Sequence, residues 1–175
     1  ANGESIELTY QTSSTDEDNN IEIDENIILG TVNRNDLTSQ KENIIIIGGR
    51  SIDEGERLLI KELGIKIYTM HEIDRLGMAH VMEESLRYLQ ARHVDGVHLS
   101  LDLDALDPLY TPGVGTPVPG GITYRESHLA MEMLQESRLI TSAEFVEVNP
   151  ILDELNRTAD VAVALIGSLF GETLV

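Results

Sequence analysis

The feature that most constrains the fold is a regular alternation, from residue 43 onward, of short apolar runs with longer segments of helical periodicity. The first run, residues 44–48, is continuously apolar and ends at a Gly-Gly pair, as expected for a strand buried on both faces. Further strand-like runs occur at residues 65–70, 96–102 and 143–148, and helical patterns occur at residues 53–63, 78–91, 123–136 and 158–170. This alternation predicts an α/β fold of three layers, in which helices flank a parallel sheet.

The first 40 residues have a different composition and predict a weakly ordered, acidic extension. They contain nine acidic side chains and a single basic residue, Arg34, among many Asn, Ser and Thr residues. Strand-like runs at residues 6–10 and 21–29 leave open that this segment folds back and adds strands to the sheet. We therefore expect an extension over residues 1–40 and one folded domain over residues 41–175.

The strongly acidic composition excludes several classes of partner. Twelve basic against thirty-one acidic side chains give a formal net charge of −19, which repels nucleic acid and anionic membrane surfaces. We expect neither a membrane span nor a secretory signal, and a cytoplasmic location. The chain has no cysteine, so oxygen and imidazole groups would have to hold any metal. Cationic small molecules, metal ions and other subunits are the expected partners.

Two aspartates at the end of the third predicted strand are candidates for metal binding. Asp102 and Asp104 lie two residues apart, so on an extended strand both carboxylates would project from the same face. Open parallel sheets bind ligands at the carboxyl ends of their strands, and Asp107 adds a third acid nearby. Carboxylate ligands favour magnesium, calcium or manganese. The alternative is that these acids only form a turn or cap a helix.

A long loop follows these aspartates and is rich in glycine and proline, a composition that is common in functional or disordered loops. The motifs of residues 97–150 are, in order, Ser-Leu-Asp-Leu-Asp-Ala-Leu-Asp-Pro, Gly-Thr-Pro, Tyr-Arg-Glu-Ser-His and Glu-Val-Asn-Pro. This order closely resembles arginases of the bacillus type, which are ureohydrolases. Weaker similarity extends back to residue 46 and forward almost to the last residue. The resemblance implies a partial arginase fold, corresponding to the carboxyl-terminal half of the domain.

The resemblance implies a metal and a guanidinium subsite. Asp102 and Asp104 match carboxylate ligands of a binuclear manganese centre, whose bridging hydroxide attacks the guanidinium carbon in this family. Glu147 matches the acid that pairs with the substrate guanidinium, a planar group that suits a bidentate carboxylate. The alternative for Glu147 is an ordinary solvated acid at the end of a strand.

The resemblance also implies further substrate contacts and a subunit contact. Thr116 matches a hydroxyl in the wall of the substrate pocket. Asp53 matches the residue that receives the substrate α-amino group, with Glu56 in support, and the alternative for both is stabilisation of the first turn of a helix. Arg125 and Glu126 match a charged pair at contacts between arginase subunits, and their alternative is a solvated helix start in which Glu126 completes a capping box.

The five histidines have no match among the catalytic histidines of the family, and we assign no metal to them. We expect His98 to be a hydrogen-bonded core residue, because an extended strand would place it about 13 Å from Asp102. His71 is expected to open a loop. His80, His93 and His128 are expected to be structural or surface residues.

The complete family site includes a Gly-Gly-Asp-His motif, an Asp-Ala-His-x-Asp motif and a His-Gly loop, none of which occurs in this sequence. The manganese ligand set is therefore incomplete, and the chain alone is expected to be inactive, although the family hydrolyses L-arginine to L-ornithine and urea. An agmatinase-like ureohydrolase and a non-catalytic binding or assembly module are the alternatives. Residues 53–56 and 147–150 favour arginase over agmatinase. We expect a homo-oligomer, because a partial sheet exposes an apolar edge.

Overall fold

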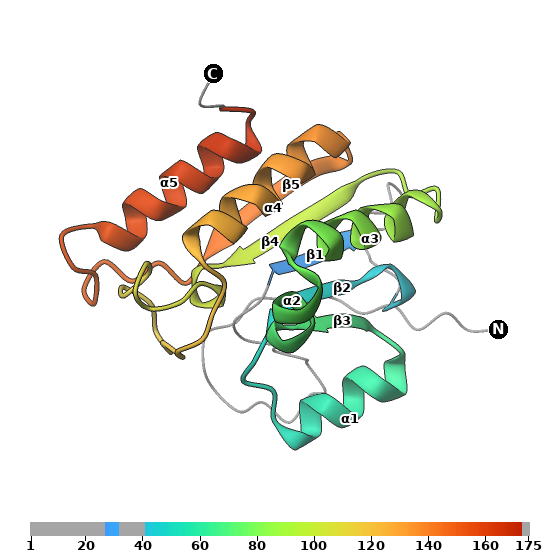
Figure 1. Cartoon of the computed structure of the whole chain (residues 1–175), viewed down its shortest axis with the longest axis horizontal. Helices are drawn as coiled ribbons and strands as arrows, with labels where there is room; N and C mark the ends of the chain where they lie inside the picture. Colours follow the sequence, from blue (N-terminus) through green and yellow to red (C-terminus); the bar gives the residue numbers. More distant parts are fainter. Residues whose placement is uncertain (1–26, 32–40, 173–175) are drawn as a thin grey trace.

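The computed structural model describes residues 27–31 and 41–172 of the chain. Most of the segment predicted to be an acidic extension lies outside these residues. The described part forms one five-stranded sheet in the order β3-β2-β1-β4-β5 (Figure 1). The strands are β1 (Ile27–Thr31), β2 (Ile45–Gly49), β3 (Lys66–Thr69), β4 (Val97–Asp102) and β5 (Ile140–Val146).

Four of the five strands run in the same direction, and β1 runs against them. β2 pairs in parallel with β3, and β4 pairs in parallel with β5. β1 lies between β2 and β4 and is antiparallel to both. The four strands predicted from the apolar runs are therefore confirmed. β1 comes from the amino-terminal segment, which was expected to add strands to the sheet if it folds back. The carboxyl ends of β2 and β4 consequently lie at the same edge of the sheet.

Helices lie on both faces of the sheet, α2 to α5 on one face and α1 on the other, in the three-layer order predicted from the sequence. The helices are α1 (Glu54–Leu63), α2 (Met70–Leu76), α3 (Met78–Gln90), α4 (Tyr124–Ser137) and α5 (Arg157–Leu169), with short 3-10 turns η1 (Lys41–Asn43) and η2 (Leu103–Ala105). The main core lies on the face that carries Ile45, Leu99 and Leu101, where α2 to α5 pack (Figure 1). On the opposite face, Ile46 packs against Ile60 of α1.

Two local expectations were wrong. His71 does not open a loop but lies in the first turn of α2, which begins directly after β3. The helix begins there because the Glu72 carboxylate accepts a hydrogen bond from the Thr69 amide at 2.9 Å, as in a capping box. In addition, β5 begins at Ile140, three residues before the predicted start. Among the described residues, no helix is both long enough and apolar enough to cross a membrane.

Candidate active site

Asp104 and Thr116 form a hydrogen-bonded pair at the carboxyl end of β4. Asp102 ends the strand, and its carboxylate accepts a hydrogen bond from the Asp104 amide at 2.7 Å. This contact starts the 3-10 turn η2, so Asp104 does not continue the extended strand and the argument from alternating faces does not hold for it. Asp104 is only 2% exposed, and its Oδ2 accepts from Thr116 Oγ1 at 2.6 Å and from the Thr116 amide at 3.4 Å.

The turn and loop that follow Asp104 are closed by Asp107. Its two carboxylate oxygens accept hydrogen bonds from the amides of Leu109 and Gly120, at 3.0 and 2.8 Å. The Leu109 bond is the main cause of the lowered pKa of Asp107, the Gly120 bond and the Arg50 charge act in the same direction, and burial opposes them. Gly121 packs directly against the main chain of the same turn. A Cβ added there would lie 2.6 Å from the Asp107 main-chain nitrogen, so only glycine fits without a shift. Asp107 is therefore a structural acid of this loop.

Glu147 lies beside the loop that carries Thr116. Asp102 of β4 pairs in register with Val146 of β5, so Glu147 follows the sheet at the same edge. Glu147 is exposed and has a positive φ of 64°, which turns the chain sharply after the strand. A Cβ added to Gly115 would lie 3.3 Å from Glu147 Oε2, so the carboxylate lies close to the loop main chain. The structure thus brings Glu147, Asp104 and Thr116 to one region.

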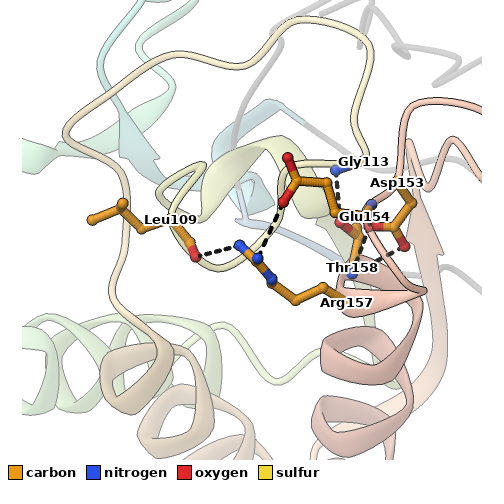
Figure 2. Close-up of polar contacts among 6 residues, drawn as sticks. All are labelled: Leu109, Gly113, Asp153, Glu154, Arg157 and Thr158. Carbon is orange, nitrogen blue, oxygen red and sulfur yellow. Dashed lines mark hydrogen bonds and ion pairs between the residues drawn. The ribbon is translucent and has the colours of Figure 1, made fainter.

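The start of α5 holds the same loop from the other side (Figure 2). The Gly113 amide donates to Thr158 Oγ1 at 2.7 Å, and its carbonyl accepts from the Asn149 amide at 2.8 Å. Asp153 accepts from the Thr158 amide at 3.0 Å, and Arg157 Nη1 donates to the Leu109 carbonyl at 3.3 Å. Burial by itself would raise the pKa of Asp153. The hydrogen bonds from Thr158 outweigh burial, so the pKa of Asp153 lies below its ordinary value. The loop is therefore tied to α5 and to the segment that follows Glu147.

Asp53 and Glu56 lie at the start of α1, beyond the carboxyl end of β2. Asp53 Oδ1 accepts from the Glu56 amide at 2.8 Å, and Glu56 Oε2 accepts from the Asp53 amide at 2.7 Å. The two residues form a reciprocal capping box, which was not predicted from the sequence, and both acids lie at the helix start where the alternative of helix-dipole stabilisation places them. Because β2 and β4 have the same direction, α1 begins at the sheet edge that carries the other candidate residues.

Arg125 and Glu126 lie in the first turn of α4. Glu126 completes a capping box with Thr123, whose amide donates to the Glu126 carboxylate at 2.9 Å. Arg125 has a side chain that is 68% exposed and lies 3.9 Å from the Glu132 carboxylate. The helix-start role proposed as the alternative for Glu126 is therefore present, and the side chain of Arg125 is accessible.

His98 and His128 form hydrogen bonds within the fold, and His80 lies 3.7 Å from the Glu84 carboxylate on α3. His98 Nδ1 lies 2.8 Å from Ser142 Oγ and its Nε2 lies 3.3 Å from Glu144 Oε1, although the side chain is 29% exposed and so lies on the sheet face rather than in the core. His128 Nδ1 lies 2.8 Å from Ser168 Oγ. Burial, followed by the Arg125 charge, lowers the pKa of His128.

The carboxylates of the described residues do not make a complete metal centre. In residues 27–31 and 41–172, no three or more His, Cys, Asp or Glu side chains gather into a group that could hold a metal ion. Asp102 and Asp104 therefore supply at most part of a ligand set.

The acids and the glycine-rich loop lie at the carboxyl ends of β4 and β5, which is the position at which open α/β sheets commonly bind ligands. The chain belongs to the arginase family, because the model described as "Arginase family" matches residues 18–171. It is 73% identical to the arginase of Bacillus caldovelox over 133 residues, which are 76% of this chain and 44% of that protein. The chain thus spans less than half the length of this curated relative.

Solved structures support the same family. The arginase of Bacillus subtilis superposes with a TM-score of 0.76 at 66% identity, over 78% of this chain and 48% of the other. The arginase of Entamoeba histolytica, solved in complex with L-ornithine, superposes with a TM-score of 0.71 at 34% identity, over 76% and 44% of the two chains. The partial arginase fold predicted from the motifs is therefore confirmed.

Several residues of the site were not identified from the sequence. Arg50 and Thr158 contact the loop from segments far away in the chain, and Asn149 was noted only as part of a motif. The only local signal for Arg50 is its place directly after a buried strand that ends in two glycines. Thr158 gave no signal beyond its place at a helix start.

Proposed function

We propose that this chain supplies part of an arginase-type active site and that the complete site hydrolyses L-arginine to L-ornithine and urea. The single observation that supports this most directly is the pairing of Asp104 with Thr116 beside Glu147, at one edge of the sheet. In the proposal, Glu147 receives the planar guanidinium through two charge-assisted hydrogen bonds. Thr116 lines the pocket.

The amino-acid end of the substrate is assigned to the start of α1. Asp53 is proposed to receive the α-amino group, and Glu56 supports Asp53 through their reciprocal hydrogen bonds. A capping role does not compete with this role, because a carboxylate accepts several hydrogen bonds at once. The positive α-amino group would also be attracted to the acidic residues at the start of α1, in a chain whose formal net charge is −19.

Two manganese ions are proposed for the complete site, with Asp102 and Asp104 among their ligands. Carboxylate oxygens suit this metal, and Asp104 is oriented by the Thr116 hydroxyl as metal ligands commonly are. The described residues do not complete the ligand set. We therefore assign no chemical step to this chain alone and propose that it is inactive alone.

The alternative is a non-catalytic binding or assembly module, which the incomplete ligand set favours. In this alternative, Glu147 still binds a guanidinium group without turnover. The exposed Arg125 at the start of α4 is proposed to contact a second copy of the chain, as its match in the family implies. Both functions share the binding step, so binding and turnover have to be measured separately.

The test measures urea release and ligand binding on the same purified chain. With manganese and L-arginine, we expect no urea above the buffer level, and agmatine serves as the comparison substrate. Titration of L-arginine followed by NMR should shift the amides of Thr116 and Gly115, and Glu147→Gln should remove these shifts. Manganese-dependent urea release that Asp104→Asn abolishes would contradict the inactivity of the chain. Shifts that persist in Glu147→Gln would contradict the guanidinium site.

A further inference from the structure

We propose that Arg50 is a positioning residue of the candidate site, which holds the Thr116 loop against the turn that carries Asp104. This inference rests on the proposed function. Arg50 follows β2, and its Nη2 donates to the carbonyls of Asp104 and Val118, both at 2.7 Å. Its Nε donates to the same Val118 carbonyl at 3.1 Å, and its Nη1 donates to the Ala105 carbonyl at 3.3 Å.

These contacts hold the main chain on both sides of the Asp104–Thr116 pair. The accepting carbonyls lie between 54 and 68 residues from Arg50 in the sequence, so the guanidinium joins separate parts of the fold. Val118 is two residues after Thr116, and Asp104 accepts through its own carbonyl. A guanidinium offers donors in a fixed planar fork, whereas a lysine ammonium is a compact charge on a flexible stem. Lysine is therefore expected to make only part of these contacts.

The same residue links the two proposed ends of the substrate. Asp53, at the proposed α-amino subsite, follows Arg50 by three residues in the same connection between β2 and α1. The Arg50 side chain reaches the turn that carries Asp104, at the proposed metal end. The separation between these two subsites is consequently set in part by one side chain that contacts neither end of the substrate in this proposal.

The charge of Arg50 predicts whether its removal should strengthen or weaken Mn²⁺ binding. Arg50 lies near enough to Asp107 for its charge to contribute to the lowered pKa of that carboxyl. A nearby cation by itself opposes metal binding, so its removal should strengthen the binding of Mn²⁺ if Arg50 acts only through charge. Removal of a positioning residue has the opposite effect, because misplaced ligands bind a metal more weakly.

The experiment compares Arg50→Gln and Arg50→Lys with Arg92→Gln in the full chain. Arg92 stacks on the Tyr88 ring and donates to the Tyr88 hydroxyl, so it is a matched control with the same loss of charge. One readout is hydrogen exchange of the Thr116 and Gly120 amides, and the other is titration with Mn²⁺ alone. Asp104→Asn identifies the part of the Mn²⁺ binding that belongs to this site.

We expect both Arg50 variants to exchange the Thr116 amide at least about tenfold faster and to bind Mn²⁺ about tenfold more weakly, as loss of a residue that orients metal ligands commonly does. Arg92→Gln should leave the exchange of the Thr116 amide unchanged and should not weaken Mn²⁺ binding. Unchanged exchange in the Arg50 variants, or stronger Mn²⁺ binding in Arg50→Gln, would overturn the proposal. If Arg50→Gln does not fold, Arg50→Lys decides by the same measures.

The failure of the proposed function has a different signature. A wild-type chain that binds no Mn²⁺ through Asp104 would contradict the metal part of the proposed function. Amide exchange at Thr116 and Gly120 would still decide whether Arg50 positions the loop, because that readout needs no metal.

Discussion

Replacing Thr158 by Val removes the acceptor of the Gly113 amide and the side-chain hydrogen bond to Asp153 at the junction between α5 and the glycine-rich loop, with little change in side-chain shape. Thr158 is fully buried, and its Oγ1 accepts from the buried Gly113 amide at 2.7 Å. A buried amide that loses its acceptor costs about 1–3 kcal/mol of folding free energy. For a chain of this size, each kcal/mol lowers the Tm by about 2–4 °C, so Thr158→Val should lower the Tm by roughly 2–12 °C.

The assays are thermal denaturation, urea denaturation and hydrogen exchange of the Gly113 amide. Thr158→Ser is the control, because it keeps the hydroxyl and loses one methyl group, at a cost of about 1 kcal/mol. The Val variant should expose the Gly113 amide to exchange, whereas the Ser variant should keep it protected. A Val variant that is as stable as the wild type, with a protected Gly113 amide, would refute the assignment of this contact as a tie between α5 and the loop.

Three further predictions concern other parts of the molecule. Gly121→Ala should lower the free energy of unfolding by about 1–3 kcal/mol, because the new Cβ would meet the main chain at Asp107. Gly115→Ala should lower it less, because its Cβ would meet the flexible side chain of Glu147, and urea denaturation of both variants tests this difference. Because the pKa of His128 is lowered in the folded state, protonation favours unfolding, so stability should fall as the pH decreases through about 6.5, and His128→Gln should reduce this slope in denaturation curves. Arg125→Ala should weaken self-association more than folding, and sedimentation that shows an unchanged, well-folded monomer for both chains at high concentration would contradict the interface proposal.

The elements of the fold were largely predictable, because their signals are local. The apolar runs of β2 and β4 and the capping pattern that starts at Thr123 predicted their elements to within one or two residues. The position and direction of β1 were not predictable, because an apolar run does not specify its partners. α2 was missed because its seven residues follow β3 without a connecting loop, and the capping pair Thr69 and Glu72 is its main local signal.

The candidate site was predictable in its acids and in Thr116, but not in the residues that hold its loop. Asp102 ends β4, Asp104 and Glu147 follow β4 and β5, and the shared direction of these strands brings the three acids to one edge. The argument that placed Asp102 and Asp104 on one face assumed an extended chain, but the Asp102 carboxylate caps a 3-10 turn at that point. Arg50 and Thr158 depend on contacts over 45 residues or more, which local patterns do not contain.

The position of Glu147 depends on the loop more than on the sheet. Among the described strands, β5 lies at one end of the order and pairs with β4 alone, so within this part of the chain the ladder supports its carboxyl end from one side. Glu147 then adopts a positive φ, a conformation that a non-glycine residue keeps only when its surroundings hold it there. The hydrogen bond from the Asn149 amide to the Gly113 carbonyl and the closeness of Gly115 provide this support. Changes that loosen the loop should therefore displace Glu147 and Thr116 together, which couples the proposed guanidinium acid to the proposed metal ligand Asp104.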